Sequence, residues 1–389
     1  MSSAIGTAVK GGGRDLRLDF FRGLALWFIF VDHIYDNIVS WLTMRNYGFS
    51  DATEVFVFIS GYTAIIAYSG IMQRSGWLRA AARIIRRVWQ LYVAHIVLLV
   101  AFVAQIAYFA VSHDRKALIA EMNLLGLMED PFNTFVDAML LKFRPINLDV
   151  LPLYIVLLAS LPLALPALKR WPWAVLGTSL VLYVLTLIFG WNLPAAPGDN
   201  VWFFNPFAWQ LVFYLGASFA SAGRMGERLA AFRRWLLPPA IAYLVFGFLI
   251  VMSWQFKFLA QLVPDWLGRQ IYPIDKTNVD VLRVLHILAL AYVVQLLIPI
   301  GAAWLRWRLV EPVRRCGEHS LQVFCLGTFL SFTAHLVTEY YGQAVWSQIL
   351  VSVLGILIMV AFAYMAHWYR KSEKPPAPRV AMAAGVGDG

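Results

Sequence analysis

The chain has 389 residues, of which 60% are hydrophobic and 14% are charged, and its mean hydropathy is +0.67. This composition excludes an ordinary soluble domain and is typical of a membrane protein. The net charge of +10 raises the question of a nucleic-acid partner, which the distribution of the basic residues answers below.

Repeated apolar runs of about twenty residues predict an all-α polytopic membrane protein, because in lipid each span must satisfy its own backbone hydrogen bonds. Segment 1–18 is then a cytoplasmic N-terminal segment, 19–370 a transmembrane domain, and 371–389, rich in Pro, Ala and Gly, a disordered cytoplasmic tail. We expect ten spans, near residues 19–42, 54–73, 88–111, 148–167, 173–190, 206–222, 236–253, 281–301, 319–337 and 345–367.

The basic residues are distributed unevenly between the predicted connections. With both termini in the cytoplasm, 22 Lys and Arg lie on the cytoplasmic side and 8 on the opposite side. This asymmetry follows the positive-inside rule. The positive charge therefore indicates orientation in a membrane, and we expect no nucleic-acid partner.

The first predicted span contains ionisable residues, which membrane helices seldom carry. It opens on Asp19 and Arg22 and is interrupted by Asp32, His33 and Asp36. An ionisable side chain near the bilayer centre costs about 2.5–3.5 kcal/mol on insertion scales, so such residues usually face a cavity or a pathway. Because Arg22 and His33 are close to three helical turns apart, they are expected on one helix face, about 16 Å apart along the axis.

His33 is the candidate catalytic residue of this span. A neutral imidazole suits a general base, since its pKa lies near the operating pH. Asp36, three residues further on, is expected on the same face and could hold one ring nitrogen, as could Glu54 from the next span. Asp32 points about 100° away and is a poorer partner. The alternative is a core histidine bonded to a neighbouring helix.

Arginines near the cytoplasmic side are candidates for binding a phosphorylated cofactor. Arg22 could hold a phosphate of coenzyme A or orient the carboxylate of Asp19 or Glu54, although interfacial arginines often only reach toward lipid headgroups. A second basic group is expected in a cytoplasmic loop continuous with a helix, where guanidinium groups could bind the polyphosphate of a CoA nucleotide. A purely topological role is its alternative. This basic group comprises Arg83, Arg86 and Arg87.

The opposite side of the membrane carries three longer predicted connections, 112–147, 191–205 and 254–280. They combine aromatic residues with Pro, Asn and Asp, a mixture that suits a carbohydrate surface, while the alternative is the aromatic belt of any membrane boundary. Asn147 and Asp149 at a span entrance could bind sugar, or could cap the helix that follows. No cluster of His, Cys or carboxylates has metal-ligand spacing in the sequence, so we expect no metal.

Three motifs follow one another in the first hundred residues: the Asp19, Arg22 and His33 pattern, EVFVFISGY at 54–62, and the basic group running into VWQLY at 88–92. Together they resemble the integral membrane acyltransferase superfamily often called acyltransferase-3. Within it the chain is most similar to the OpgC family, through LDFFRG at 18–23, SDATEVFVF at 50–58 and SLQVF at 320–324. Glu54 stands where the superfamily has Asp, and Gln90 where it usually has Pro.

The OpgC resemblance implies succinylation of osmoregulated periplasmic glucans. It implies an acyl-CoA co-substrate, in the first place succinyl-CoA, a periplasmic glucan acceptor, and a multi-pass protein of the bacterial inner membrane. A succinyl donor would need a cation for its carboxylate, and Arg283 is the first candidate, with a local ion pair to Asp280 as the alternative. No oligomeric state is predicted.

The leading hypothesis is therefore an inner-membrane O-acyltransferase. The pantetheine arm of a cytoplasmic acyl-CoA would reach inward to His33, and a glucan hydroxyl would enter from the other side. A permease or proton-coupled exporter is the alternative, with Asp32, His33 and Asp36 as a proton relay. A third interpretation is a structural subunit of a glucan-synthesis complex, which would tolerate alanine at His33 and Arg22.

Overall fold

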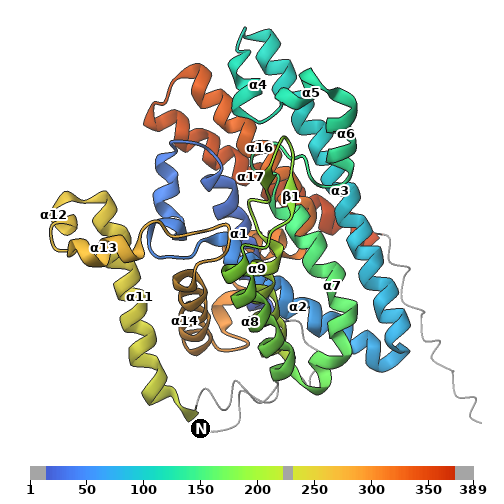
Figure 1. Ribbon diagram of the computed structural model, residues 1–389, viewed down its shortest axis with the longest axis vertical. Coiled ribbons are helices and arrows are strands. Elements are labelled where there is room, and N and C mark those ends of the chain that lie inside the picture. Colours follow the sequence, from blue (N-terminus) through green and yellow to red (C-terminus); the bar gives the residue numbers. More distant parts are fainter. Residues whose placement is uncertain (1–14, 222–230, 373–389) are drawn as a thin grey trace, which may run out of the picture.

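The computed structural model describes residues 15–221 and 231–372, and this part of the chain is almost entirely helical (Figure 1). Each of the ten predicted spans overlaps a helix. Among the described residues, seven helices are long and apolar enough to cross a membrane, and α1, α9 and α14 are shorter. The ten helices are α1 (Leu16–Asp32), α2 (Ala52–Ser75), α3 (Trp77–Ser112), α7 (Val150–Arg170), α8 (Pro172–Phe189), α9 (Pro206–Ser221), α11 (Arg233–Gln255), α14 (Val281–Leu297), α16 (Ser320–Tyr341) and α17 (Val345–Ser372).

These apolar helices define a multi-pass helical membrane protein, since helices of this length and composition are what a bilayer requires. The number of spans and the side on which the termini lie remain predictions. The predicted tail 371–389 and the N-terminal segment 1–18 fall mostly outside the described residues.

The first helix is shorter than predicted. It ends at Asp32, with His33 as its C-cap, so the prediction of a helix over 19–42 is wrong. Asp36 then adopts the left-handed conformation with φ 54°, and the side chain of Asn37 accepts a hydrogen bond from Val39 N at 3.1 Å. Asp and Asn favour such turns because their short side chains bond to nearby main chain. The chain continues as two short 3-10 helices, η1 (Ile38–Leu42) and η2 (Met44–Asn46).

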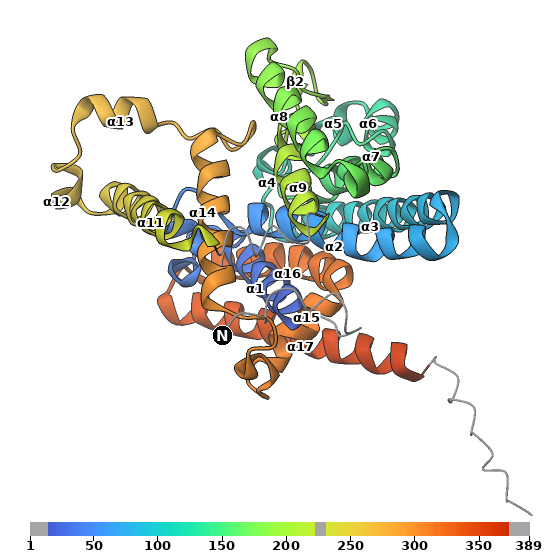
Figure 2. The ribbon, with the colours of Figure 1, turned by 90° about the horizontal axis from the view of Figure 1, so that it is seen from below.

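The longer connections contain short elements rather than open loops. Helices α12 and α13 stand clear of the bundle beside α11 (Figure 2), whereas α4 contacts α3, and α5 and α6 follow it at the same end of the molecule (Figure 1). The strands β1 and β2 form a small antiparallel hairpin. The short elements are α4 (Ala117–Glu121), α5 (Leu125–Glu129), α6 (Pro131–Met139), β1 (Pro194–Ala195), β2 (Asn200–Val201), α12 (Lys257–Ala260), α13 (Asp265–Ile271), η3 (Ala303–Arg306) and α15 (Glu311–Glu318).

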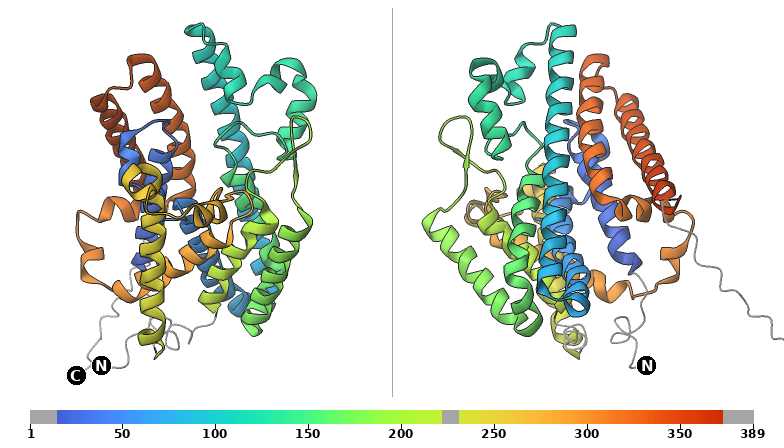
Figure 3. Two further views of the ribbon diagram at one scale, coloured as in Figure 1. Left: turned by 60° about the vertical axis from the view of Figure 1, so that its left-hand side comes forward. Right: turned by 90° about the vertical axis from the view of Figure 1, so that its right-hand side faces the viewer.

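Glycines allow two pairs of helices to approach closely at the centre of the bundle. A Cβ at Gly61 of α2 would lie 2.0 Å from a main-chain oxygen of α9, and one at Gly216 of α9 would lie 2.0 Å from a main-chain oxygen of α2. Gly23 of α1 and Gly317 of α15 meet in the same way. Small residues matter at such crossings because close packing, rather than a hydrophobic effect, holds helices together in lipid. Helices α1 and α2 are thus held against their neighbours, with α3 and the α16–α17 pair further out (Figure 3).

Candidate active site

His33 lies at the end of α1, where the helix has main-chain carbonyl groups without a helical partner. Its ring Nδ1 is 2.5 Å from the main-chain oxygen of Ile29. A carbonyl oxygen can only accept, so Nδ1 carries the hydrogen and donates it to Ile29. In neutral imidazole the other nitrogen, Nε2, then has the lone pair. The helix end thereby selects the tautomer in which Nε2 can act as a base.

Charged residues surround this end of α1. The Asp32 carboxylate accepts a hydrogen bond from Thr43 Oγ1 at 2.6 Å, and Arg45 donates to the main-chain oxygen of Asp32 at 3.3 Å. Arg45, Asp51 and Lys276 all act electrostatically on both Asp32 and His33. His33 is therefore close to a group of ionised side chains drawn from distant parts of the sequence.

The carboxylates expected to orient His33 lie elsewhere. Because α1 ends at Asp32, Asp36 is not on a helical face three residues from His33; it is exposed in the turn that follows. Glu54 is fully buried at the start of α2 and binds Arg283 of α14, whose Nε is 2.7 Å from Glu54 Oε1. Ile29 takes the position at Nδ1 that a carboxylate was expected to occupy.

Glu54 and Arg283 belong to a buried ionic cluster with Asp51 and Lys276. Asp51 Oδ2 is 2.6 Å from Lys276 Nζ and 3.1 Å from Arg283 Nη2, while Arg283 Nη2 is 2.6 Å from Glu54 Oε1. Burial raises the pKa of Asp51, but Lys276 and Arg283 outweigh that effect and hold it well below its ordinary value. Asp51 and Glu54 also form a capping box at the start of α2. The proposed cation for a succinyl carboxylate, Arg283, is thus already bound by two carboxylates.

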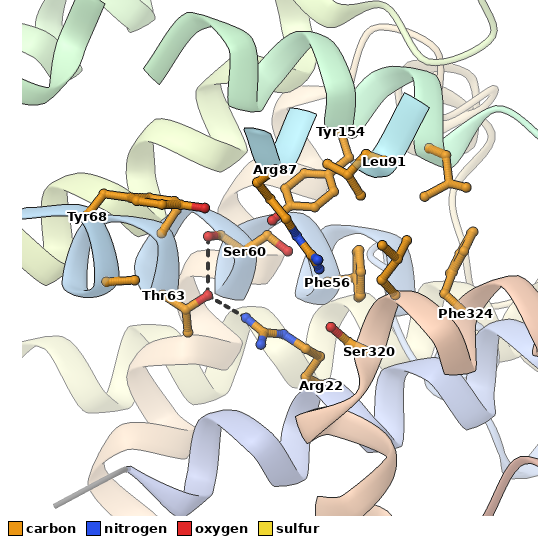
Figure 4. A pocket seen from close by; sticks show the side chains of 14 residues that line it. Arg22, Phe56, Ser60, Thr63, Tyr68, Arg87, Leu91, Tyr154, Ser320 and Phe324 are labelled. Atoms are coloured by element: carbon orange, nitrogen blue, oxygen red, sulfur yellow. Dashed lines mark hydrogen bonds between the residues drawn. The ribbon is translucent and has the colours of Figure 1, made fainter. Parts of the chain in front are cut away.

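Arg22 and Arg87 face one another across a cavity of about 210 Å³, which we call the arginine cavity (Figure 4). Arg22 donates to Thr63 Oγ1 of α2. No Asp or Glu is among the residues that line the cavity in the described part of the chain. The other polar lining residues are Ser60, Thr63 and Tyr68 of α2, Tyr154 of α7 and Ser320 of α16. Two guanidinium groups that line one cavity form a site suited to an anion.

The other basic candidates have different surroundings. Arg83 and Arg86 lie in α3, which begins at Trp77, so the predicted loop at these positions is wrong, and both side chains are exposed. Arg87 is half-buried and is the member of this basic group that reaches the arginine cavity. Asp19 is buried in α1, where the main chains of α1 and α15 touch.

The two polar residues expected to bind sugar lie in a turn before α7. Arg144 Nε donates to Asp149 Oδ1 at 2.9 Å, and the guanidinium of Arg144 stacks on Trp202 with 4.3 Å to the ring centroid. Burial raises the pKa of Asp149, and Arg144 opposes that shift. Asp149 makes no side-chain capping bond to α7, so the capping alternative does not hold for it. Asn147 adopts φ 71° in the turn itself.

The sequence did not reveal a gathering of possible metal ligands at the start of α16. Ligand atoms of Glu318, His319 and His367 lie within 4.8 Å of one another. The prediction that no cluster has metal-ligand spacing missed this group, because His367 lies in α17, far along the chain from the other two residues. Arg315 donates to Glu318 at 3.0 Å and also contacts His367 at 3.0 Å. That positive charge opposes a metal cation at the same place.

Fold and site together define a multi-pass helical membrane protein whose central helices carry a histidine with its Nδ1 at a main-chain oxygen and a cavity lined by two arginines. The chain matches the family described as OpgC protein over residues 14–371, nearly its whole length, and it belongs to that family. Membership indicates an acyltransferase that modifies a glucan. Comparison with curated proteins and with solved structures found no match.

Proposed function

We propose that this protein is an inner-membrane O-acyltransferase that moves an acyl group, in the first place succinyl, from cytoplasmic acyl-CoA to a hydroxyl of a periplasmic glucan. The observation that carries the proposal is the contact between His33 Nδ1 and the main-chain oxygen of Ile29. Because a carbonyl oxygen only accepts, this contact places the hydrogen on Nδ1 and leaves the lone pair on Nε2. The arginine cavity, reached by Arg22 on the same helix, offers a second site for an anionic donor.

The proposed reaction needs one base and one leaving group. Nε2 of His33 takes the proton of the attacking glucan hydroxyl as its oxygen bonds to the thioester carbonyl carbon. The carbon–sulfur bond then breaks, and the thiolate of coenzyme A leaves and takes the proton from the imidazolium. Lys276 and Arg45, which act electrostatically on His33, would favour the negative charge of the intermediate over a long-lived imidazolium.

The arginine cavity is proposed to hold the anionic part of the donor. Guanidinium groups bind phosphate or carboxylate through paired hydrogen bonds, so Arg22 and Arg87 suit either a phosphate of coenzyme A or the succinyl carboxylate. A volume of about 210 Å³ accommodates such a group rather than a whole nucleotide. The pantetheine arm would then run along α1 toward His33.

The rival function is a proton-coupled exporter in which Asp32, His33 and Asp36 relay a proton. A relay through imidazole must accept a proton at one nitrogen and release it at the other. Here Nδ1 is bonded to a main-chain oxygen, and Asp32 is bonded to Thr43. These bonds favour the transferase over the relay.

The test uses purified protein in lipid nanodiscs with succinyl-CoA or acetyl-CoA and periplasmic glucan, and mass spectrometry of the glucan product. His33→Ala should abolish ester formation while the protein stays folded. His113 is a matched control, because it is the C-cap of α3 and its Nδ1 lies 3.2 Å from the main-chain oxygen four residues earlier. His113→Ala should retain transfer. Equal transfer by wild type and His33→Ala would remove His33 from the mechanism, and glucan flux without ester formation would favour the exporter.

A further inference from the structure

Beside the catalytic end of α1 the surface is hollowed over a volume of about 540 Å³, within the range of about 300–1,000 Å³ that ligand pockets occupy. We call it the η1 hollow, because most of its lining comes from the turn after α1 and from η1. Asp32 and Ile34, the two neighbours of His33, both line it. The residues used below are Asp32, Tyr35, Asp36, Ser40, Trp41 and Arg45.

The lining combines aromatic rings with hydrogen-bonding groups of both kinds. Tyr35 is 41% exposed and packs its ring edge-on against His335, while Trp41 is half-buried. Flat rings of this kind pair with the C–H faces of sugar rings, and their polar atoms remain available at the edge. Asp36 makes no hydrogen bond to any described residue, and a carboxylate can accept from two neighbouring hydroxyls at once. Such a surface suits a polyhydroxylated ligand.

The charges of the η1 hollow select among such ligands. The acidic side chains of Asp32 and Asp36 and the guanidinium of Arg45 all line the hollow. Arg45 already donates to the main-chain oxygen of Asp32. With Arg45 balanced by these acidic groups, the lining carries no excess positive charge to hold a phosphate or carboxylate ligand, including a lipid headgroup phosphate, and it favours a neutral one. Neutral sugar rings meet both conditions, because they offer hydroxyl donors to the carboxylates and apolar faces to the rings.

The turn that carries Asp36 is held in place by the fold. The backbone adopts φ 54° at Asp36, a left-handed region that Asp tolerates well. Two hydrogen bonds to α17 also hold the turn. Asn37 Nδ2 donates to Ser352 at 2.9 Å, and Gln348 accepts from Ile38 N at 2.6 Å. The carboxylate is therefore presented to the hollow by a rigid support.

We propose that the η1 hollow is the acceptor subsite, where neutral sugar units of the glucan bind so that a hydroxyl reaches His33. This proposal rests on the proposed acyl transfer, and it moves the acceptor from the positions expected from the sequence. Asp149 is engaged by Arg144, and Arg283 by Asp51 and Glu54. The η1 hollow instead adjoins both sequence neighbours of the catalytic histidine.

The proposal is tested with three variants of the full chain in nanodiscs. Trp41→Ala removes a ring from the hollow, and Asp36→Asn removes the charge while Asn still tolerates the left-handed backbone. Trp346→Ala is the matched control, because Trp346 is exposed at the start of α17 next to the lining residue Val345 but does not line the hollow. Two quantities are measured: KM for the periplasmic glucan at saturating acyl donor, and saturation-transfer NMR with maltotriose, sophorotriose, laminaritriose and gentiotriose.

We expect KM for the glucan to rise about tenfold for Trp41→Ala, a change typical of losing one aromatic contact in a binding site. Asp36→Asn should raise it less, KM for the donor should not change, and Trp346→Ala should behave as wild type. NMR should show contact between at least one trisaccharide and wild type, and its loss in Trp41→Ala.

The outcomes separate this proposal from the proposed function. Transfer by wild type with an unchanged glucan KM in both hollow variants would overturn the subsite and leave the transferase in place. Trisaccharide binding that Trp41→Ala abolishes, together with no transfer from any donor, would support the subsite and overturn the transferase. Equal loss of binding in Trp346→Ala would show an unspecific effect and would also overturn the subsite.

Discussion

Replacing Glu54 by Gln tests whether the buried ionic cluster is structural or catalytic. Glu54 is fully buried and the Arg283 side chain is 10% exposed, with 2.6 Å between Arg283 Nη2 and Glu54 Oε1. Removing one partner of a buried pair costs about 3–5 kcal/mol, because the other charge is left without compensation. Arg283 keeps Asp51 at 3.1 Å, so we expect Glu54→Gln to lower the free energy of unfolding by about 3 kcal/mol, at the lower end of that range.

A double-mutant cycle measures the interaction itself. Arg283→Gln leaves the buried Glu54 without this cation and should lower the free energy of unfolding by about 4–5 kcal/mol. The double variant Glu54→Gln/Arg283→Gln should lower it by about 2–3 kcal/mol less than the sum of the single effects. The matched control is the more exposed pair Arg315–Glu311 at 2.8 Å, whose coupling should stay below about 1 kcal/mol. Denaturant titration of the protein in one detergent gives all four free energies.

The same variant separates two roles for Glu54. If Glu54 only holds α2 to α14, Glu54→Gln should retain acyl transfer per folded molecule. Additive single effects in the cycle would refute the ion-pair reasoning. Unchanged stability with abolished transfer would instead restore Glu54 as a catalytic partner of His33.

Three further predictions follow from other contacts. Asp51→Asn should be less stable than wild type by a constant amount above about pH 4, and this stability difference should shrink at lower pH. The reason is that a carboxyl with a depressed pKa loses its stabilising effect as it protonates. A stability difference that widens on acidification, in denaturation experiments from pH 3 to 7, would contradict this. Gly61→Ala should lower the melting temperature sharply, because its Cβ would meet a main-chain oxygen of α9 at 2.0 Å, whereas Gly177→Ala, with no atom within 4 Å, should leave it unchanged or raise it. Arg87→Gln should raise KM for the acyl donor at least about tenfold while the exposed Arg83→Gln does not, and equal effects in steady-state kinetics would remove the arginine cavity from donor binding.

The helices of this protein were predictable because an apolar segment in lipid must form its backbone hydrogen bonds within itself, as a helix does. Each of the ten expected runs overlaps a helix, including 173–190 and 206–222. The end of α1 was not predictable from hydropathy, since the run continues past Asp32 with Ile34 and Ile38. Local bonds of Asn37 and the left-handed Asp36 stop the helix there, and such turn chemistry competes with helix propensity only in a folded context.

The sequence relates candidate residues only within one helix. Arg22 and His33 could be connected through helical periodicity, and a joint role for them is a prediction. The partners of Glu54 could not be, since Arg283 and Lys276 lie more than 200 residues away and no periodicity crosses that distance. A capping box, Asp51 with Glu54, is visible in the sequence, but it explains only the local bonds of that pair. The contact of Nδ1 with Ile29 depends on where α1 ends, and it was therefore missed with the helix end.

The segment that leads into α14 has a consequence for how that helix is positioned along its axis. Lys276 O accepts from Trp209 at 3.2 Å, Val279 O accepts from Tyr183 at 2.7 Å, and the His286 ring is 2.6 Å from Ser50 Oγ. A slide of α14 by one residue, about 1.5 Å, would break these bonds together with the bonds to Asp51 and Glu54. Most of these groups are buried, and a buried polar group left without a partner costs free energy. The contacts therefore stabilise a single register of α14 along its axis, and with it the position of Lys276 near His33.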